Sequence, residues 1–366
     1  MKKLTKITLA LLASLAITSS ALAGEFTVTG SAKATYTIVG SDSASGQVSK
    51  PQGIGISNEF SLGASGELDN GWSWTYAQDI DAATVQDDAA MSMTTPYGVF
   101  KACISECGLS ANLAWDTSTY GAGSDYGFTG SSASTTAPGD DATTFTWGTS
   151  ISSYNNIQYH TPADMLPFGL KVELAFAPED DGTINSANSA ATVDENANSV
   201  TQWRVSAAPI DGLSIKASYL DKDGDVNGTG AKTIQNYAAG GIGGTYTMGI
   251  ASLGYGKFWV APTLGTKTTG TAYVDHYENT AMSIGLAASD NLSLSYTVEE
   301  STEENRNNSA AGVTTRTTTD FEIRAIQLAY TMGGMTLSIA QKDLENTDYT
   351  ADKDTKETIF AVSMAF

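Results

Sequence analysis

The stretch that decides the fold is Lys356–Phe366, K-E-T-I-F-A-V-S-M-A-F. One parity of this stretch holds Thr358, Phe360, Val362, Met364 and Phe366, and the other holds mostly small residues, Ile359, Ala361, Ser363 and Ala365. This period of two over roughly ten residues predicts a strand with one apolar face. An uncovered apolar strand invites aggregation in a soluble protein. It fits a strand that closes a barrel and turns its apolar face to lipid.

The first 23 residues have the pattern of a secretory signal peptide. Three lysines surround Leu4-Thr5, the apolar run Ile7–Ile17 follows, and Ala21-Leu22-Ala23 is an A-x-A cleavage site. The run is too short for a membrane helix. We therefore expect export, cleavage after Ala23, and a mature chain, 24–366, that forms one barrel.

The composition favours strands and disfavours anionic partners. The chain is 41% hydrophobic, contains 36 glycines, and has only 16% charged residues, against about 25% in typical proteins. Removal of Lys2, Lys3 and Lys6 leaves 16 basic and 40 acidic residues, a net charge of −24. This charge argues against nucleic acid as a partner and favours the attraction of cations.

The alternation of apolar and polar residues continues along the chain. It is clear over Glu25–Ile38, and Asp69-Asn70-Gly71 is a tight hairpin signal. Seven such short turns alternate with eight long polar intervals, which predicts sixteen strands in an all-β, transmembrane, antiparallel β-barrel. The long intervals are 40–52, 82–88, 105–153, 178–199, 221–233, 261–271, 301–315 and 345–355.

Three of the expected strands have irregular patterns. Gln235–Tyr246 is rich in glycine and has few residues for an outward face, and Gly249–Val260 does not keep to one parity. In Asp320–Tyr330 the apolar set moves from one parity to the other, which predicts either a β-bulge near Ala325 or a different register there.

The interval 105–153 is much longer than the other intervals, and long loops without regular structure are commonly functional. Charged residues on this loop and on the expected lumen face are candidates to line a narrow pore, where opposing charges select solutes by size and charge. The loop candidates are Asp116, Asp125, Asp140 and Asp141. The strand candidates are Lys33, Glu59, Asp79, Lys101, Lys171, Glu173, Arg204 and Lys216. A solvated lumen position, away from the narrowest point, is the alternative for each residue.

Cys103 and Cys107 are the two cysteines of the chain. An exported protein reaches an oxidising compartment, so we expect a disulfide between them. Residues four apart in a strand are roughly 13 Å apart, too far to bridge. A bridge therefore requires the chain to bend sharply within 104–106.

Two further motifs are candidates for metal binding and for catalysis. Asp221, Asp223 and Asp225 resemble the start of an EF-hand calcium loop, but Val226 stands where glycine is needed and Lys232 where the bidentate Glu is needed. A polar hairpin loop is the alternative there. His160 and His276 are the only histidines, and neither lies near a nucleophile signature such as G-x-S-x-G. We expect no enzyme and no cofactor.

Asn155–Pro162, N-N-I-Q-Y-H-T-P, followed by Pro167-Phe168-Gly169 and the strand Leu170–Phe176, resembles a segment of the general porins of Gram-negative bacteria. The signal peptide, strand count, long third loop and terminal Phe are also similar, whereas a P-E-F-G-G motif is absent. The resemblance implies a homotrimer of sixteen-stranded barrels, each with a water-filled lumen narrowed by the third loop folded inward. It also implies that Phe366 is part of an assembly signal for the barrel-insertion machinery.

These observations predict an outer-membrane porin of a Gram-negative bacterium, surrounded by lipid and lipopolysaccharide. It would pass small hydrophilic solutes by passive diffusion and prefer cations. A substrate-specific channel, an outer-membrane barrel enzyme and a secreted all-β binding or adhesion protein are the alternatives.

Overall fold

The structure is a computed structural model that describes residues 24–41, 52–81, 84–117, 148–162, 164–178, 199–223, 235–264, 272–308 and 314–365. The predictions for the signal peptide, Asp125, Asp140, Asp141, Asp225 and Phe366 fall outside these residues.

The described residues form sixteen strands and three short 3-10 helices. The strands are β1 (Glu25–Ser41), β2 (Gln52–Glu67), β3 (Ser73–Asp81), β4 (Thr84–Thr95), β5 (Gly98–Ile104), β6 (Asn156–His160), β7 (Lys171–Ala177), β8 (Ser199–Ala207), β9 (Leu213–Asp223), β10 (Ala238–Met248), β11 (Ala251–Ala261), β12 (Ala272–Ser289), β13 (Leu292–Asn308), β14 (Thr314–Met332), β15 (Met335–Glu345) and β16 (Thr355–Ala365). The 3-10 helices are η2 (Ile151–Ser153), η3 (Pro167–Gly169) and η4 (Thr347–Tyr349).

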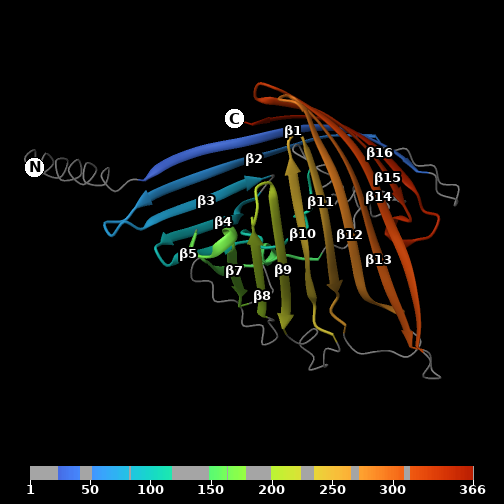
Figure 1. Ribbon diagram of the computed structural model, residues 1–366, viewed down its shortest axis with the longest axis horizontal. Helices are drawn as coiled ribbons and strands as arrows, with labels where there is room; N and C mark the ends of the chain where they lie inside the picture. Colours follow the sequence, from blue (N-terminus) through green and yellow to red (C-terminus); the bar gives the residue numbers. More distant parts are fainter. Residues whose placement is uncertain are drawn as a thin grey trace, which may run out of the picture.

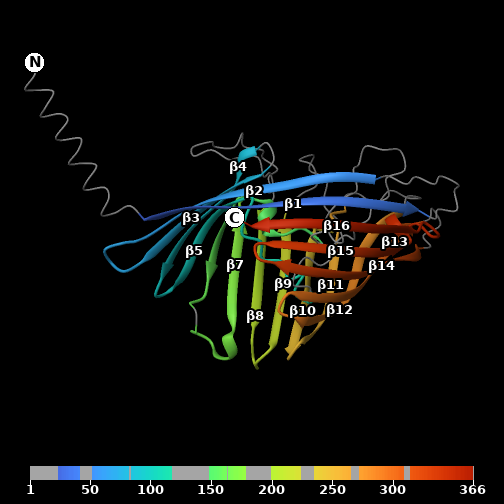
Figure 2. The same ribbon diagram turned by 90° about the horizontal axis from the view of Figure 1, so that it is seen from above.

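Each strand pairs antiparallel with its neighbour in sequence, and β16 pairs with β1 to close the barrel. Tyr36 lies opposite Phe360 in this closing pair. Figures 1 and 2 show the strands as one curved wall, with the C-terminal strand beside β1. The predicted sixteen-stranded antiparallel barrel is confirmed. Among the described residues, no helix is both long and apolar enough to span a membrane.

The alternation in β16 separates two faces of the wall. Phe360 and Met364 are 44% and 51% exposed, whereas Ile359 and Ala361 are each 3% exposed. The register carries this alternation from strand to strand, so exposed apolar side chains continue around the wall. They include Phe60, Met91, Phe100, Leu174, Trp203, Tyr219, Tyr255, Ile284, Tyr296, Leu328 and Ile339. We call this face outward and the opposite face inward.

Several of the long polar intervals are shorter than predicted because strands run into them, and the effect is largest in two. β4 begins at Thr84, so most of 82–88 is strand, and β13 continues to Asn308 within 301–315. A membrane strand needs only about 9–11 residues, whereas β12, β13 and β14 have 18, 17 and 19. The part of a strand beyond this length needs no apolar outward face, so its sequence resembles that of a loop.

The prediction of a β-bulge near Ala325 is wrong. β14 pairs with β13 and β15 without a register shift, and Phe321, Ile323 and Ala325 are all inward and buried. The apolar set changes parity because Phe321 and Ile323 pack on the inward face, whereas Ile326, Leu328 and Tyr330 lie on the outward face and are exposed. A register shift occurs instead in β12, between Val274 and His276.

Candidate pore-lining surface

The strand register places the predicted strand candidates on the inward face. Lys101 lies opposite Ser92 and Gln158, Arg204 opposite Glu173 and Ser218, and Lys216 opposite Ser206 and Gly243. Lys33, Lys171 and Asp79 have the same parity, opposite Ser363, Ser206 and Ser61. For Glu59 the structure gives the backbone register alone, opposite Ser31 and Asp81. The basic candidates other than Lys33 all belong to β5–β9, so the structure brings them together on one part of the wall.

Glu173 is the centre of a polar cluster on this part of the wall. The Arg204 guanidinium donates to both carboxylate oxygens of Glu173, at 2.9 Å from Nη2 and through a short contact from Nε. His160 Nδ1 lies 3.3 Å from Glu173 Oε1, and His160 Nε2 lies 2.7 Å from Gln158 Oε1. Glu173 is only 7% exposed, so the Arg204 pairing compensates a carboxylate that is largely removed from water.

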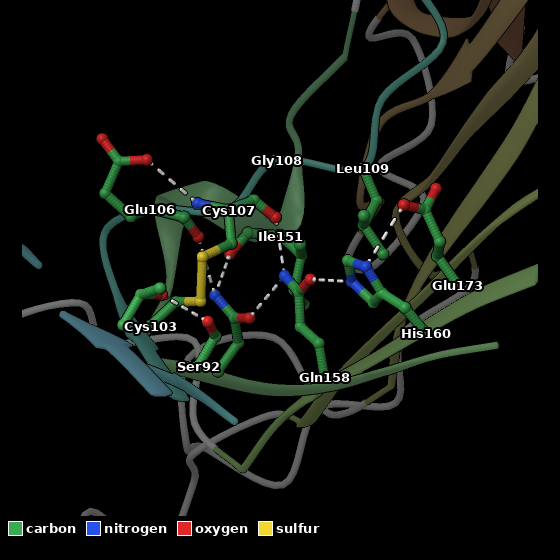
Figure 3. The surroundings of a disulfide bond; sticks show 12 residues. Ser92, Cys103, Glu106, Cys107, Gly108, Leu109, Ile151, Gln158, His160 and Glu173 are labelled. Carbon is green, nitrogen blue, oxygen red and sulfur yellow. Dashed lines mark hydrogen bonds and ion pairs between the residues drawn. A yellow bond between two sulfur atoms is a disulfide. The ribbon is translucent and has the colours of Figure 1, made fainter. Parts of the chain in front are cut away.

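Cys103 and Cys107 form a disulfide at the end of β5, with their Cα atoms 6.1 Å apart. The bend that such a bridge requires lies at Ser105 and Cys107, whose φ angles are 49° and 67°. Figure 3 shows the polar side chains around this bend. Gln158 donates to the Cys107 carbonyl oxygen at 2.6 Å, and Asn156 donates to the Glu106 carbonyl oxygen at 3.1 Å.

After the disulfide, the main chain of 108–117 follows the inward face from β8 to β12. Arg204 Nη1 donates to the Gly108 carbonyl oxygen at 3.3 Å, and the Ala111 amide donates to Ser218 Oγ at 2.9 Å. Further along, Ser283 Oγ donates to the Trp115 carbonyl oxygen at 2.7 Å. We call residues 108–117 the wall segment. The rest of the predicted loop, 118–147, lies outside the described residues, so its inward path and the role of Asp116 in a constriction stay predictions.

Trp115 anchors the wall segment in an inward apolar cluster. Its side chain is fully buried and packs with Phe258 of β11, Ala281 of β12, and Phe321 and Ile323 of β14. Its Nε1 donates to the Asn112 carbonyl oxygen at 2.7 Å, which satisfies the buried indole N–H. These contacts explain why half of β14 is apolar on its inward face.

A second apolar cluster holds the two ends of the loop against β7, β8 and β9. Leu109, Ile151 and Tyr154 pack with Ala175, Ala177, Val200 and Leu220. Nearby, the Tyr237 hydroxyl accepts a hydrogen bond from the Thr149 amide at 2.7 Å. Burial raises the pKa of Tyr237, so its hydroxyl stays neutral at physiological pH.

Three charged residues of β13, β15 and β16 are buried on the inward face. Lys342 Nζ lies 2.7 Å from Glu357 Oε2, and the two side chains are 1% and 6% exposed. Glu299 is fully buried and neither of its carboxylate oxygens accepts a hydrogen bond. Asp116 and Lys342 both lie within electrostatic range of Glu299. Sequence reasoning missed this group because alternation gives the face of a residue but not what covers it.

Among the described residues, the candidate calcium motif is not a coiled loop, and a second group of possible metal ligands already pairs with arginines. Asp221 and Asp223 belong to β9, whose extended backbone differs from the coiled start of an EF-hand loop. Asp275, His276 and Glu304 have ligand atoms within 4.8 Å of one another. Arg306 and Arg316 pair with Asp275 and Glu304 at 2.6 Å and 3.3 Å, so a metal ion would compete with two guanidinium groups.

No protein-family model matches the sequence, and no curated protein is detectably similar to it. The barrel is similar to several solved structures. An outer membrane protein of Vibrio cholerae, OmpT, has a TM-score of 0.62 and 11% identity, and the alignment covers 94% of this chain and 98% of that one. An anion-selective porin from Comamonas acidovorans has a TM-score of 0.61 and 12% identity, with 94% and 100% covered. OmpF of Salmonella typhi has a TM-score of 0.55 and 12% identity, with 94% and 98% covered. This chain therefore has the barrel fold of these outer-membrane proteins along almost its whole length.

Proposed function

We propose that the chain is an outer-membrane porin of a Gram-negative bacterium, a water-filled channel through which small hydrophilic solutes diffuse. The observation that carries the proposal is the division of the closed wall into an outward apolar face and an inward face with many polar and charged residues. Only lipid can cover a continuous outward apolar belt without another protein layer, and a polar interior supports water.

Two measurements test this function. The full-length protein, expressed in a Gram-negative host, should fractionate with the outer membrane, and the purified protein should form ohmic channels in a planar lipid bilayer. A protein that is freely soluble in the periplasm would support the secreted all-β alternative, and a membrane-inserted protein without conductance would exclude an open pore.

We infer a preference for cations from the net charge of −24 that remains after the first 23 residues are removed. The charge of the inward face of β5–β9 favours the opposite preference, for anions. Its basic residues are Lys101, Lys171, Arg204, Lys216 and Lys222, and Glu173 is the one acidic residue there among the described positions. The sign of the reversal potential in a salt gradient decides between them.

The contribution of the basic wall can be measured directly. Lys171→Gln removes an inward charge and should shift the reversal potential toward cation selectivity. Lys356→Gln removes an outward charge, 64% exposed, and should leave the potential unchanged. Equal shifts in the two variants would show that overall charge, not the inward face, sets selectivity.

We further propose a homotrimer, and the similar barrel of Vibrio cholerae OmpT, which has been solved in a trimer form, supports this proposal. A heat-modifiable trimer on native-like gels is the expected result. Lipid, lipopolysaccharide and the barrel-insertion machinery are its proposed partners during assembly. Deletion of Phe366 should lower the amount of inserted protein more than it alters the conductance of channels that do form.

A further inference from the structure

Inward positions of β10, β11 and β12 under the wall segment are occupied by glycine. Gly243 pairs with Gly256, Gly254 pairs with Thr245, and Gly285 pairs with Ser252. We call Gly243, Gly254, Gly256 and Gly285 the glycine seat. Glycine inside a strand is destabilising relative to alanine, so a group of inward glycines needs a structural reason.

The reason is the close approach of the wall segment to the sheet. A Cβ atom built on Gly254 would lie 1.6 Å from the Trp115 carbonyl oxygen, and one on Gly285 would lie 2.7 Å from the Thr117 carbonyl oxygen. At Gly256 the added atom would lie 2.5 Å from Phe258 Cε2 and 2.9 Å from Trp115 Cδ1. At Gly243 it would lie 3.2 Å from Phe258 Cζ and 3.3 Å from the Trp115 amide nitrogen. Real Cβ contacts below 3.0 Å essentially do not occur, so the main chain at 115–117 can rest here only because side chains are missing.

Specific contacts fix the segment at this place. Ser283 Oγ, which lies 2.5 Å from the added Cβ position on Gly254, donates to the same Trp115 carbonyl oxygen. The buried Trp115 ring prevents the segment from sliding along the wall, because Phe258, Phe321 and Ile323 surround it. The glycine seat thus sets how close the main chain lies to the wall, and Trp115 sets where it lies along the wall.

We propose that the glycine seat and Trp115 are positioning residues that determine the open cross-section of the channel at the level of the wall segment. This inference rests on the proposed channel function. Ordinary van der Waals contact begins near 3.4 Å, so a methyl group at Gly254 needs about 1.8 Å more space from the Trp115 carbonyl oxygen than the present arrangement leaves. The wall lies on one side, so the segment can move only toward the lumen.

The test compares Gly254→Ala and Gly285→Ala with a matched control, Gly55→Ala. Gly55 is also inward, on β2, and its added Cβ meets only Thr35 Oγ1, at 3.3 Å, among the described atoms. All variants are made in the full-length protein, and heat-modifiability on gels confirms that each barrel is folded. The chain has six tryptophans, and Trp115→Phe identifies the Trp115 signal in ¹⁹F NMR spectra of 5-fluorotryptophan-labelled protein.

We expect both seat variants to shift the Trp115 resonance and to lower single-channel conductance, with Gly55→Ala unchanged in both measurements. Unshifted Trp115 resonances in the folded seat variants would overturn the seat itself. If the Trp115 resonance shifts in the seat variants but their conductance equals that of the wild type, the glycine seat does not determine the channel width. If the wild-type barrel does not conduct but the Trp115 resonance shifts in the seat variants, the channel function is refuted and the glycine seat is retained. Failure of the proposed function and failure of the seat are therefore distinguishable.

Discussion

At the residue scale, Glu299 shows that part of the inward face does not behave as a lumen surface. A carboxylate in a water-filled lumen would be solvated, but Glu299 is fully buried with neither oxygen hydrogen-bonded. Burial of an unpaired carboxylate is costly. Its presence indicates that the inward face of β13 is partly a protein interior and not only a lumen surface.

Glu299→Gln should therefore stabilise the barrel at pH 8. The amide keeps the shape of the carboxylate and removes the charge, so the free energy of unfolding should rise by about 1–3 kcal/mol. Urea unfolding in lipid vesicles, followed by tryptophan fluorescence, measures the change. Glu300→Gln is the control, because Glu300 is the exposed neighbour on the outward face, and its effect should be near zero. A loss of stability in Glu299→Gln would contradict this account.

Lys342→Met should have the opposite effect. Lys342 and Glu357 compensate each other inside the wall, so removal of the ammonium leaves a buried carboxylate unpaired. We expect a loss of about 3–5 kcal/mol in unfolding free energy. The double variant Lys342→Met with Glu357→Gln should recover most of that loss, and a double variant as unstable as the single one would show that packing of the lysine stem, not charge, is responsible.

At the element scale, the disulfide turn and the three irregular strands depend on the wall segment. The Cys103–Cys107 bridge closes the bend through which the chain leaves β5 for the inward face. The glycines of β10 and β11 and the inward apolar half of β14 are places where the same segment packs. These elements were irregular in sequence because a tertiary contact, and not the barrel pattern, selects their residues.

Reduction of the disulfide should destabilise the turn at the end of β5. The loop between the cysteines is short, so the chain-entropy relation gives a contribution of only about 2 kcal/mol. Unfolding with and without dithiothreitol measures this difference. The double variant Cys103→Ser with Cys107→Ser should match the reduced protein and should no longer respond to the reductant; a continued response would point to another cause.

At the scale of the whole molecule, the two faces of the wall determine where a charge can be placed. Phe60 and Ser61 are neighbours on β2, with Phe60 outward and 40% exposed and Ser61 inward, opposite Asp79. Phe60→Lys should destabilise the inserted barrel by about 2–4 kcal/mol, as expected for lysine near the middle of a lipid face. Ser61→Lys should cost much less because its ammonium faces water and a carboxylate. Equal costs, measured by unfolding from vesicles, would contradict the assignment of the faces.

The sequence by itself determined the barrel. Alternation in Lys356–Phe366 and the sequence of short turns and polar intervals predicted sixteen strands and the inward parity of Lys101, Glu173 and Arg204, because the period of a strand fixes the face of each residue. The tertiary structure alone decided that Trp115 lies on the glycines of β10–β12, that Phe321 and Ile323 face inward, and that Glu299 is buried. Such contacts join residues more than a hundred positions apart, and strand periodicity holds no information on which distant segment covers a given face.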